Sequence, residues 1–290
     1  MPSIKAIKQR RNVVTNMKQA MKAMNLVATA KLRKSRERWG NTLPFLEGTD
    51  SIMLNAAKSP AAAGNIYVCI RNKTHKNTGY IVLTSDRGKC GSYNINICKA
   101  VMAHASAQGK NPLILPIGTR GTDIFVSHSQ NIHRQLGSMS ESPTYNEAEA
   151  IGAQVLADFA ENIDELYIGF TRYHTVLNLE PIVKPVLPIN LRFAEEKVNT
   201  ENFEPPLMEY DPDVDSFLAY MAPMYLNVQI YGAMLEAALC EQAARMVATD
   251  TATNNAEELI ESLTLLFNRQ RQGIITQEIT EIVSGASALT

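Results

Sequence analysis

A loop with two glycines offers the clearest candidate chemistry. The stretch Ser85-Asp86-Arg87-Gly88-Lys89-Cys90-Gly91-Ser92-Tyr93 lies between an expected strand and an expected helix. Folds of the α/β class often bind phosphate at such a position, through glycine amides and the helix N-terminus. The spacing matches neither Gly-x-Gly-x-x-Gly nor the Walker pattern, because no Lys-Ser/Thr pair follows Gly91. The alternative is a structural loop in which the glycines allow a tight turn and Asp86 pairs with Arg87.

Cys90 gives the same loop a second chemical interpretation. A cysteine exposed on a sharp strand-to-helix turn and activated by the helix dipole would be the nucleophile of a thiol-dependent enzyme. No catalytic base beside it can be named from the sequence. The four cysteines are Cys69, Cys90, Cys98 and Cys240, and they form no Cys-x-x-Cys pair. Neither a zinc site nor a disulfide framework is expected, and the thiols are expected to be reduced.

The histidines are scattered among polar neighbours, so we expect solvated surface residues and not metal ligands. They are His75, His104, His128, His133 and His174. No cofactor and no metal are expected.

The two ends of the chain carry opposite charge. Residues 5–38 contain eleven Lys or Arg against one acid, Glu37, which gives a local net charge of +10. Residues 250–290 contain six acids against Arg269 and Arg271, which gives −4. The ends can therefore attract each other, and the basic end can attract an acidic partner. The dense run from Lys31 to Arg38 would also suit nucleic acid, although it has no interleaved aromatics before Trp39.

The chain of 290 residues and 45% hydrophobic content has the composition of a soluble protein. We expect no signal peptide, because the start has no apolar core before a small-residue cleavage site, and no apolar run approaches the roughly 18 residues that span a bilayer. A cytosolic protein is expected, which can still sit on a membrane complex. The basic, acid-poor start also resembles a mitochondrial transit peptide; the helical pattern continuing past residue 30 argues against that interpretation.

Both ends have helical periodicity. An apolar stripe near the start predicts a helix from about Ser3 to Ser35 that could continue past Pro44 with a kink. A second stripe predicts a helix from Ser216 to Val283, in which Pro223 bends or restarts the first turns. The stripe of the first helix is Ile7, Val14, Met17, Met21, Met24 and Ala28. The second helix follows a polar, proline-rich segment, 190–212, that is typical of a linker. Two such helices are expected to pair antiparallel.

The middle of the chain alternates between strand and helix patterns. Strands are expected at 66–70, 80–84, 113–118, 166–170 and 183–189, and helices at 93–107 and 145–162. Strands separated by single helices indicate a small, mostly parallel sheet. The predicted fold is α/β, in which a long antiparallel coiled coil of the terminal helices carries an inserted, small Rossmann-like domain. The expected divisions are 1–58 and 201–290 for the coiled coil and 59–200 for the sheet domain.

Several motifs together resemble one family. The most specific is the C-terminal run Ile275-Thr276-x-Glu278-x-x-Glu281-x-x-x-Gly285-Ala286-x-Ala288. It is supported by Lys22-Ala23-Met24 with Val27-Ala28 and Lys31-x-Arg33-Lys34, by Ser85-Asp86-Arg87-Gly88 with Cys90-Gly91, by Gln242-Ala243-Ala244-Arg245-Met246, and by Asn268-x-x-Arg271-Gln272. In this order, and over essentially the whole chain, they resemble the gamma subunits of rotary F-type ATP synthases of the bacterial type.

The resemblance implies a central rotor shaft with no chemistry of its own. Such a shaft couples proton or sodium flow through a membrane ring to conformational cycling of the catalytic beta subunits. The implied partners are the alpha and beta subunits of the catalytic hexamer, the epsilon subunit and the membrane c-ring, with no nucleic acid. The implied contacts with alpha and beta subunits are Met24, Lys31, Arg33, Lys34, Arg271, Gln272, Thr276 and Glu278. The implied location is the cytoplasmic face of a bacterial cell membrane, as a peripheral subunit held there by the complex.

One loop departs from the family pattern. The family commonly has Gly-Leu-Cys-Gly-Gly where this chain has Gly88-Lys89-Cys90-Gly91-Ser92, which leaves the packing of that loop open. The added cysteine pair of the chloroplast type is not seen in the sequence, so thiol control of rotation is not expected. The thiol-dependent enzyme and the nucleic-acid binder remain the alternatives: replacing Cys90 would abolish the first activity, and neutralising Lys31 to Arg38 the second.

Overall fold

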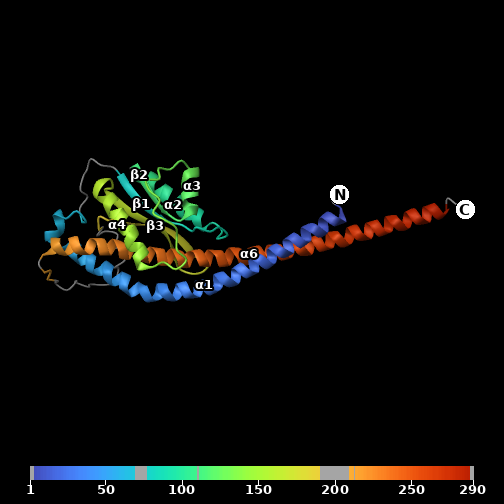
Figure 1. Cartoon of the computed structure of the whole chain (residues 1–290), viewed down its shortest axis with the longest axis horizontal. Coiled ribbons are helices and arrows are strands. Elements are labelled where there is room, and N and C mark those ends of the chain that lie inside the picture. The colour runs from blue at the N-terminus through green and yellow to red at the C-terminus, as the bar shows by residue number, and fades with distance from the viewer. Residues whose placement is uncertain (1–2, 69–76, 110, 190–208, 212, 288–290) are drawn as a thin grey trace. The chain divides into compact units, whose positions relative to one another are not determined.

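Two long helices hold the ends of the chain, and an α/β region lies between them in sequence (Figure 1). The computed structural model describes residues 3–68, 77–109, 111–189, 209–211 and 213–287. Helix α1 spans Ile4–Lys58 and helix α6 spans Val214–Ser287. Both helices continue through a proline, Pro44 in α1 and Pro223 in α6. The expected long terminal helices are confirmed, but α6 neither ends nor restarts at Pro223.

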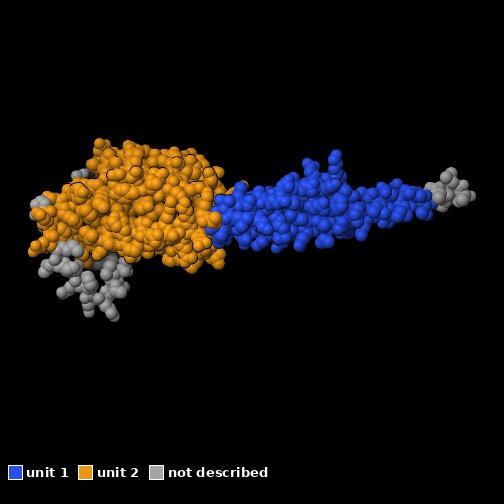
Figure 2. Space-filling model, turned by 60° about the horizontal axis from the view of Figure 1, so that its bottom comes forward, with its two compact units in different colours: residues 1–29, 246–290 blue, residues 30–245 orange. Residues whose placement is uncertain are grey.

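The chain divides into two compact units (Figure 2). The helix-pair unit combines residues 1–29 with residues 246–290, and the sheet unit spans Ala30–Arg245. Each is described by itself below.

A four-stranded sheet forms the centre of the sheet unit. Its strands are β1 Asn77–Leu83, β2 Asn111–Ile117, β3 Glu165–Tyr173 and β4 Leu179–Leu187, in the order β2-β1-β3-β4. Strand β1 runs parallel to both β2 and β3, and β4 runs antiparallel to β3. The expected α/β fold with a mostly parallel sheet is therefore confirmed.

Three helices connect the strands: α2 Tyr93–Gln108, α3 Thr119–Ser127 and α4 Tyr145–Glu161. A capping box starts α4, in which the Thr144 hydroxyl accepts from the Glu147 amide and the Glu147 carboxylate accepts from the Thr144 amide. Helix α3 was not among the helices expected from the sequence. Gly118 and Gly121 allow α3 to approach the end of β1 closely, since a Cβ at either position would collide with Thr84, the residue after β1.

The strand expected at 66–70 is wrong for residues 66–68. They form a turn after a short 3-10 helix, η1, at Pro60–Gly64. Asn65 directs this turn: its side-chain oxygen accepts from the Tyr67 amide at 3.0 Å, and its carbonyl accepts from the Val68 amide at 3.0 Å. These local bonds use donors that a strand would offer to a neighbour. Residues 69 and 70, and most of the expected linker (190–208 and 212), lie outside the described residues.

The sheet buries both of its faces. Because side chains alternate along a strand, Ile81 and Leu83 face one core while Tyr80 and Val82 face the other. The first core is completed by α4 and by the parts of α1 and α6 in the sheet unit. The second is completed by α2 and α3. This two-sided burial explains the continuous apolar character of β1.

The two edges of the sheet differ. The segment 131–137, in the connection from α3 to α4, runs beside β2, where the Ile114 amide donates to the Asn131 carbonyl at 3.0 Å and two isolated bridges form. At the other edge, β4 contains Pro181 and Pro185, which have no N–H to donate.

Candidate interaction surfaces

A narrow apolar seam joins the two helices of the helix-pair unit. Ile7 and Val14 of α1 are buried against Ala256 and Leu263 of α6, with Phe267 packed beside them. Their spacing along each helix is the one-sided repeat that pairs two helices. The expected stripe is confirmed for Ile7 and Val14.

Polar contacts fix the direction of this pairing. The Arg11 guanidinium lies 5.4 Å from the centre of the Phe267 ring, Lys18 Nζ lies 2.6 Å from Glu257 Oε1, and Asn25 Nδ2 donates to the Met246 carbonyl at 2.9 Å. Positions advance along α1 as they fall along α6, so the helices are antiparallel, as expected. The hydrogen bond from Lys18 and its charge lower the pKa of Glu257. The basic and acidic ends of the chain therefore do meet, at this pair.

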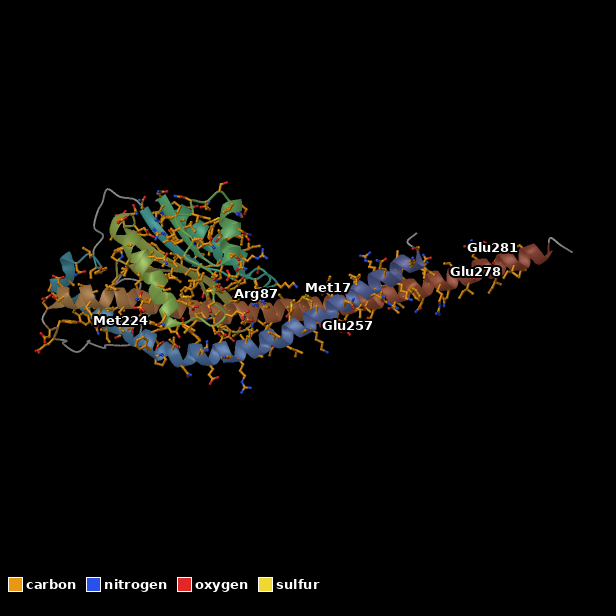
Figure 3. All side chains as sticks on the ribbon, in the orientation of Figure 1. Met17, Arg87, Met224, Glu257, Glu278 and Glu281 are labelled. Carbon is orange, nitrogen blue, oxygen red and sulfur yellow. The ribbon has the colours of Figure 1, made fainter. Side chains whose placement is uncertain are left out.

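Four large apolar side chains of α1 are left out of the seam. They are Val13, Met17, Leu26 and Val27, each more than half exposed. Figure 3 labels Met17 on α1 and Glu257 on α6, both in the helix-pair unit. The assignment of Met17 to the packed stripe was wrong, because the seam uses the heptad positions of Ile7 and Val14 and leaves Met17 on another side of the helix. Exposed apolar side chains among basic ones suit a protein partner with apolar and acidic groups.

The last part of α6 has a second exposed surface. Residues 271–284 are all exposed, and α6 continues past the N-terminus of α1 within the helix-pair unit (Figure 1). Five aliphatic side chains in this stretch are 41–70% exposed: Ile274, Ile275, Ile279, Ile282 and Val283. Two acidic residues, Glu278 and Glu281, lie among them, and Figure 3 labels both on this stretch. A helix with this many exposed aliphatic residues is typical of one that is covered by a partner.

The C-terminal contact residues expected from the motifs lie on this surface. Arg271, Gln272, Thr276 and Glu278 are exposed. The Thr276 hydroxyl donates to the Gln272 carbonyl at 2.9 Å, so this side chain is held against its own helix. The structure thus brings these four together on a single helical stretch.

The N-terminal contact residues are divided between the units. Met24 is partly buried in the helix-pair unit, whereas Arg33 and Lys34 are exposed in the sheet unit. Lys31, also in the sheet unit, forms an ion pair with Glu141. Glu141 was missed by the sequence reasoning, because a single acid in the connection between α3 and α4 has no pattern that would link it to α1.

Glu141 holds two cations at once. Its Oε2 pairs with Lys31, and its Oε1 lies 2.7 Å from Arg87 Nη1. The hydrogen bond from Lys31 is the largest cause of a lowered pKa for Glu141, and the charges of Lys31, Arg87 and Arg245 act in the same direction. The expected Asp86–Arg87 pair is therefore wrong for Arg87, which pairs with Glu141. The Asp86 carboxylate accepts instead from the amides of Thr119 at 2.8 Å and Met139 at 2.9 Å.

The Cys90 thiol is buried, contrary to what a nucleophile requires. Only 3% of the residue is exposed, and its sulfur lies 3.3 Å from Asn94 Nδ2 and 3.7 Å from Ser85 Oγ. Burial raises the pKa of the thiol, which disfavours the reactive thiolate. Cys98 and Cys240 are buried as well, and Cys69 lies outside the described residues. The geometry therefore argues against a thiol-dependent enzyme.

The loop also uses internally the groups that would hold a phosphate. The Ser85 amide donates to Asn94 Oδ1 at 2.9 Å, and the Thr119 amide at the start of α3 donates to Asp86. Gly91 has φ 58°, the left-handed conformation that a tight turn needs. These observations favour the structural interpretation of the loop.

Two histidines expected at the surface, His104 and His133, are instead partly buried, and His133 Nε2 lies 3.3 Å from Asp158 Oδ1. His104 Nδ1 lies 3.0 Å from the Tyr80 hydroxyl, and its ring centre lies 4.8 Å from that of Tyr167. Burial lowers the pKa of His104. Within the described ranges, no His, Cys, Asp and Glu gather into a group that could hold a metal ion, and no helix there has the length and apolar character to cross a bilayer.

Comparison with known proteins decides the family. Residues 3–289 match the family model described as ATP synthase. The gamma chain of the ATP synthase of Acetobacterium woodii, named as sodium ion specific, is 35% identical over 99% of both chains. The chain belongs to the ATP synthase gamma chain family. The gamma chain of Lachnoclostridium phytofermentans is 34% identical over the full length of both chains.

Solved structures share the fold of this gamma chain. A chain of the Euglena gracilis mitochondrial ATP synthase, in a structure of OSCP, F1 and c-ring, matches with a TM-score of 0.67 and 18% identity over 99% of this chain and 94% of that one. A chain of the Tetrahymena thermophila central stalk and c-ring structure matches with a TM-score of 0.62 and 22% identity over 80% of this chain and 99% of that one. The family indicated by the motifs, a non-catalytic rotor subunit of the membrane-bound ATP synthase complex, is confirmed.

Proposed function

We propose that this gamma chain is the central rotor shaft of a bacterial F-type ATP synthase that couples ion flow through the membrane ring to nucleotide chemistry in the beta subunits. The observation that carries the proposal is the exposed stretch 271–284 of α6, a helix with five exposed aliphatic side chains and no core of its own to bury them. A shaft that is surrounded by partners needs such a surface, and an asymmetric one can favour a different state in each beta subunit. The coupling ion is a proton or sodium.

We assign the contacts with alpha and beta subunits to two groups of residues. Arg271, Gln272, Thr276 and Glu278 form the C-terminal group, which their exposure on one helical stretch supports. The N-terminal group is Met24, Lys31, Arg33 and Lys34. The exposure of Arg33 and Lys34 supports contacts with acidic loops of beta subunits. Lys31 can join them only by leaving Glu141 or by sharing its charge with it.

The remaining partners follow from the rotor role. We propose that the sheet unit faces the epsilon subunit and the c-ring, and that the complex holds the chain at the cytoplasmic face of the bacterial membrane. In this proposal 1–58 and 201–290 act as the shaft and 59–200 as its foot. The basic residues serve protein partners and not nucleic acid.

A double variant tests the C-terminal group. Arg271→Ala with Gln272→Ala should weaken the coupling of ATP hydrolysis to ATP-driven ion pumping in the assembled complex, because it removes two partner contacts without touching a buried residue. Removal of residues 288–290, the last three of the sequence, is the matched comparison and should weaken coupling less, because it leaves Arg271 and Gln272 in place. Equal hydrolysis and pumping in both variants would contradict the assigned contacts.

A subunit inventory tests the function as a whole. Purification of the tagged chain from its native membrane should recover the other subunits of the ATP synthase. A chain recovered without them would overturn the rotor proposal.

A further inference from the structure

The loop after β1 lies where α/β sheets usually bind a ligand, at the carboxyl ends of parallel strands. In this chain α6 lies against that loop instead. Cys90 and Tyr93 are buried against Cys240 of α6, and the Tyr93 hydroxyl donates to the Ala237 carbonyl at 3.1 Å. A position that could hold a small molecule is therefore used to attach a helix.

The same loop is held to the sheet on its other side. Asp86 accepts from the first amide of α3, Thr119, and from the amide of Met139. The second of these bonds places residues 139–141 next to the loop. That position brings Glu141 within reach of Arg87 in the loop and of Lys31 in α1.

A second polar group links the loop to α6. Arg245 Nη2 lies 2.6 Å from Glu241 Oε1 and 3.5 Å from the carbonyl oxygens of Arg87 and Gly88. The Glu241 and Arg245 side chains are largely buried, and the charge of Arg245 opposes the rise that burial causes in the pKa of Glu241. This pair is therefore partly shielded from solvent, where an ion pair is screened less.

These contacts lie at one end of the sheet unit on both helices. The unit begins at Ala30 in α1 and ends at Arg245 in α6. Lys31 is therefore next to its first residue, and Arg245 is its last residue. Arg87, labelled in Figure 3, comes from the loop whose carbonyl oxygens face Arg245. We call the set Lys31, Asp86, Arg87, Tyr93, Glu141 and Arg245 the joint.

We propose that the joint fixes the sheet to α1 and α6 where these helices leave the sheet unit, so that the sheet and both helices turn as one body. In this proposal Tyr93 and Glu141 are positioning residues for torque transfer. Apolar packing between the sheet and the helices is strong but non-directional, whereas hydrogen bonds and ion pairs select one register. The proposal rests on the rotor function proposed above.

The test uses the whole ATP synthase carrying Tyr93→Phe with Glu141→Gln. These changes remove the bond to Ala237 and the charge that holds Lys31 and Arg87, with little change in side-chain volume. Loss of two such contacts should speed amide hydrogen exchange of residues 85–94 by about tenfold. ATP hydrolysis should stay within about twofold, since the catalytic subunits are unchanged, while the ratio of ATP-driven ion pumping to hydrolysis should fall several-fold.

The matched control is Tyr145→Phe with Glu149→Gln, two chemically identical changes on α4 of the same unit. It should leave both the exchange of residues 85–94 and the pumping ratio at their wild-type values. Unchanged exchange in the joint variant would overturn the joint, and faster exchange with an unchanged pumping ratio would overturn its role in torque transfer. Failure of the rotor function itself is distinguishable, because the wild-type chain would then not be recovered with ATP synthase subunits.

Discussion

Lys184 Nζ on β4 lies 3.3 Å from Asp50 Oδ2 on α1. Gln229 of α6 completes the set: its Oε1 accepts from Lys184 at 2.6 Å, and its Nε2 donates to Asp50 Oδ1 at 2.7 Å. Three elements of the sheet unit therefore share one partly buried polar network. Such a network favours one register of the helices on the sheet, because each slip would leave a polar group without its partner.

Lys184→Met should destabilise the sheet unit by about 2 kcal/mol, since it leaves Asp50 and Gln229 without a charged hydrogen-bond partner. Urea unfolding followed by the fluorescence of the single tryptophan, Trp39, measures this in the sheet unit. Lys99→Met on the exposed side of α2 is the matched control and should change stability by less than about 0.5 kcal/mol. Equal stabilities of the two variants would show that the network contributes little.

The seam of the helix-pair unit gives a second prediction. Leu263 is 6% exposed and Leu265 is 72% exposed, two residues further along α6. Leu263→Ala should cost about 2 kcal/mol, because it removes a buried side chain from a narrow seam, whereas Leu265→Ala should cost less than about 0.5 kcal/mol. Amide exchange of residues 4–29 in the isolated chain, which should quicken only in the first variant, is the measurement. Similar exchange in both would disprove the seam.

His104 gives a prediction about pH. Burial lowers its pKa below the ordinary 6.5, so on acidification the unfolded chain binds this proton before the folded chain does. The contribution of His104 to stability is therefore complete above about pH 6.5 and falls as the pH drops from there through the folded-state pKa. Unfolding free energies between pH 7.5 and 5 should decline more steeply for the wild type than for His104→Gln. Parallel curves would contradict this.

The long helices and most strands were predictable because their signals are local. The spacing of Ile7 and Val14 predicts the buried side of α1, and the apolar run of β1 predicts a buried strand; each pattern is complete within one element. Helix α3 was not predictable, since it is only nine residues long and the glycine inside it, Gly121, is needed for the close contact with Thr84, the residue after β1. The turn at 66–68 was mistaken for a strand because β-prone residues outweighed the single side chain of Asn65 that directs it.

The interaction surfaces were predictable only in part. Motifs located Arg271 and Gln272 on a helix, and the structure adds that their surroundings are exposed. The partner of Lys31 lies 110 residues away in an irregular connection, and only the folded chain brings Glu141 to it. The burial of Cys90 could not be predicted either, because a cysteine beside glycines is typical of both a reactive and a buried thiol. Its burial depends on packing against α6, which is distant in sequence.

The two edges of the sheet have a consequence for a subunit that must wait for its partners after synthesis. Hydrogen bonds from segment 131–137 already occupy β2, and Pro181 and Pro185 interrupt the donors of β4. A neighbouring chain therefore finds little unpaired backbone with which to extend the sheet. We therefore expect the newly made protein to resist strand-to-strand aggregation at both edges of this sheet.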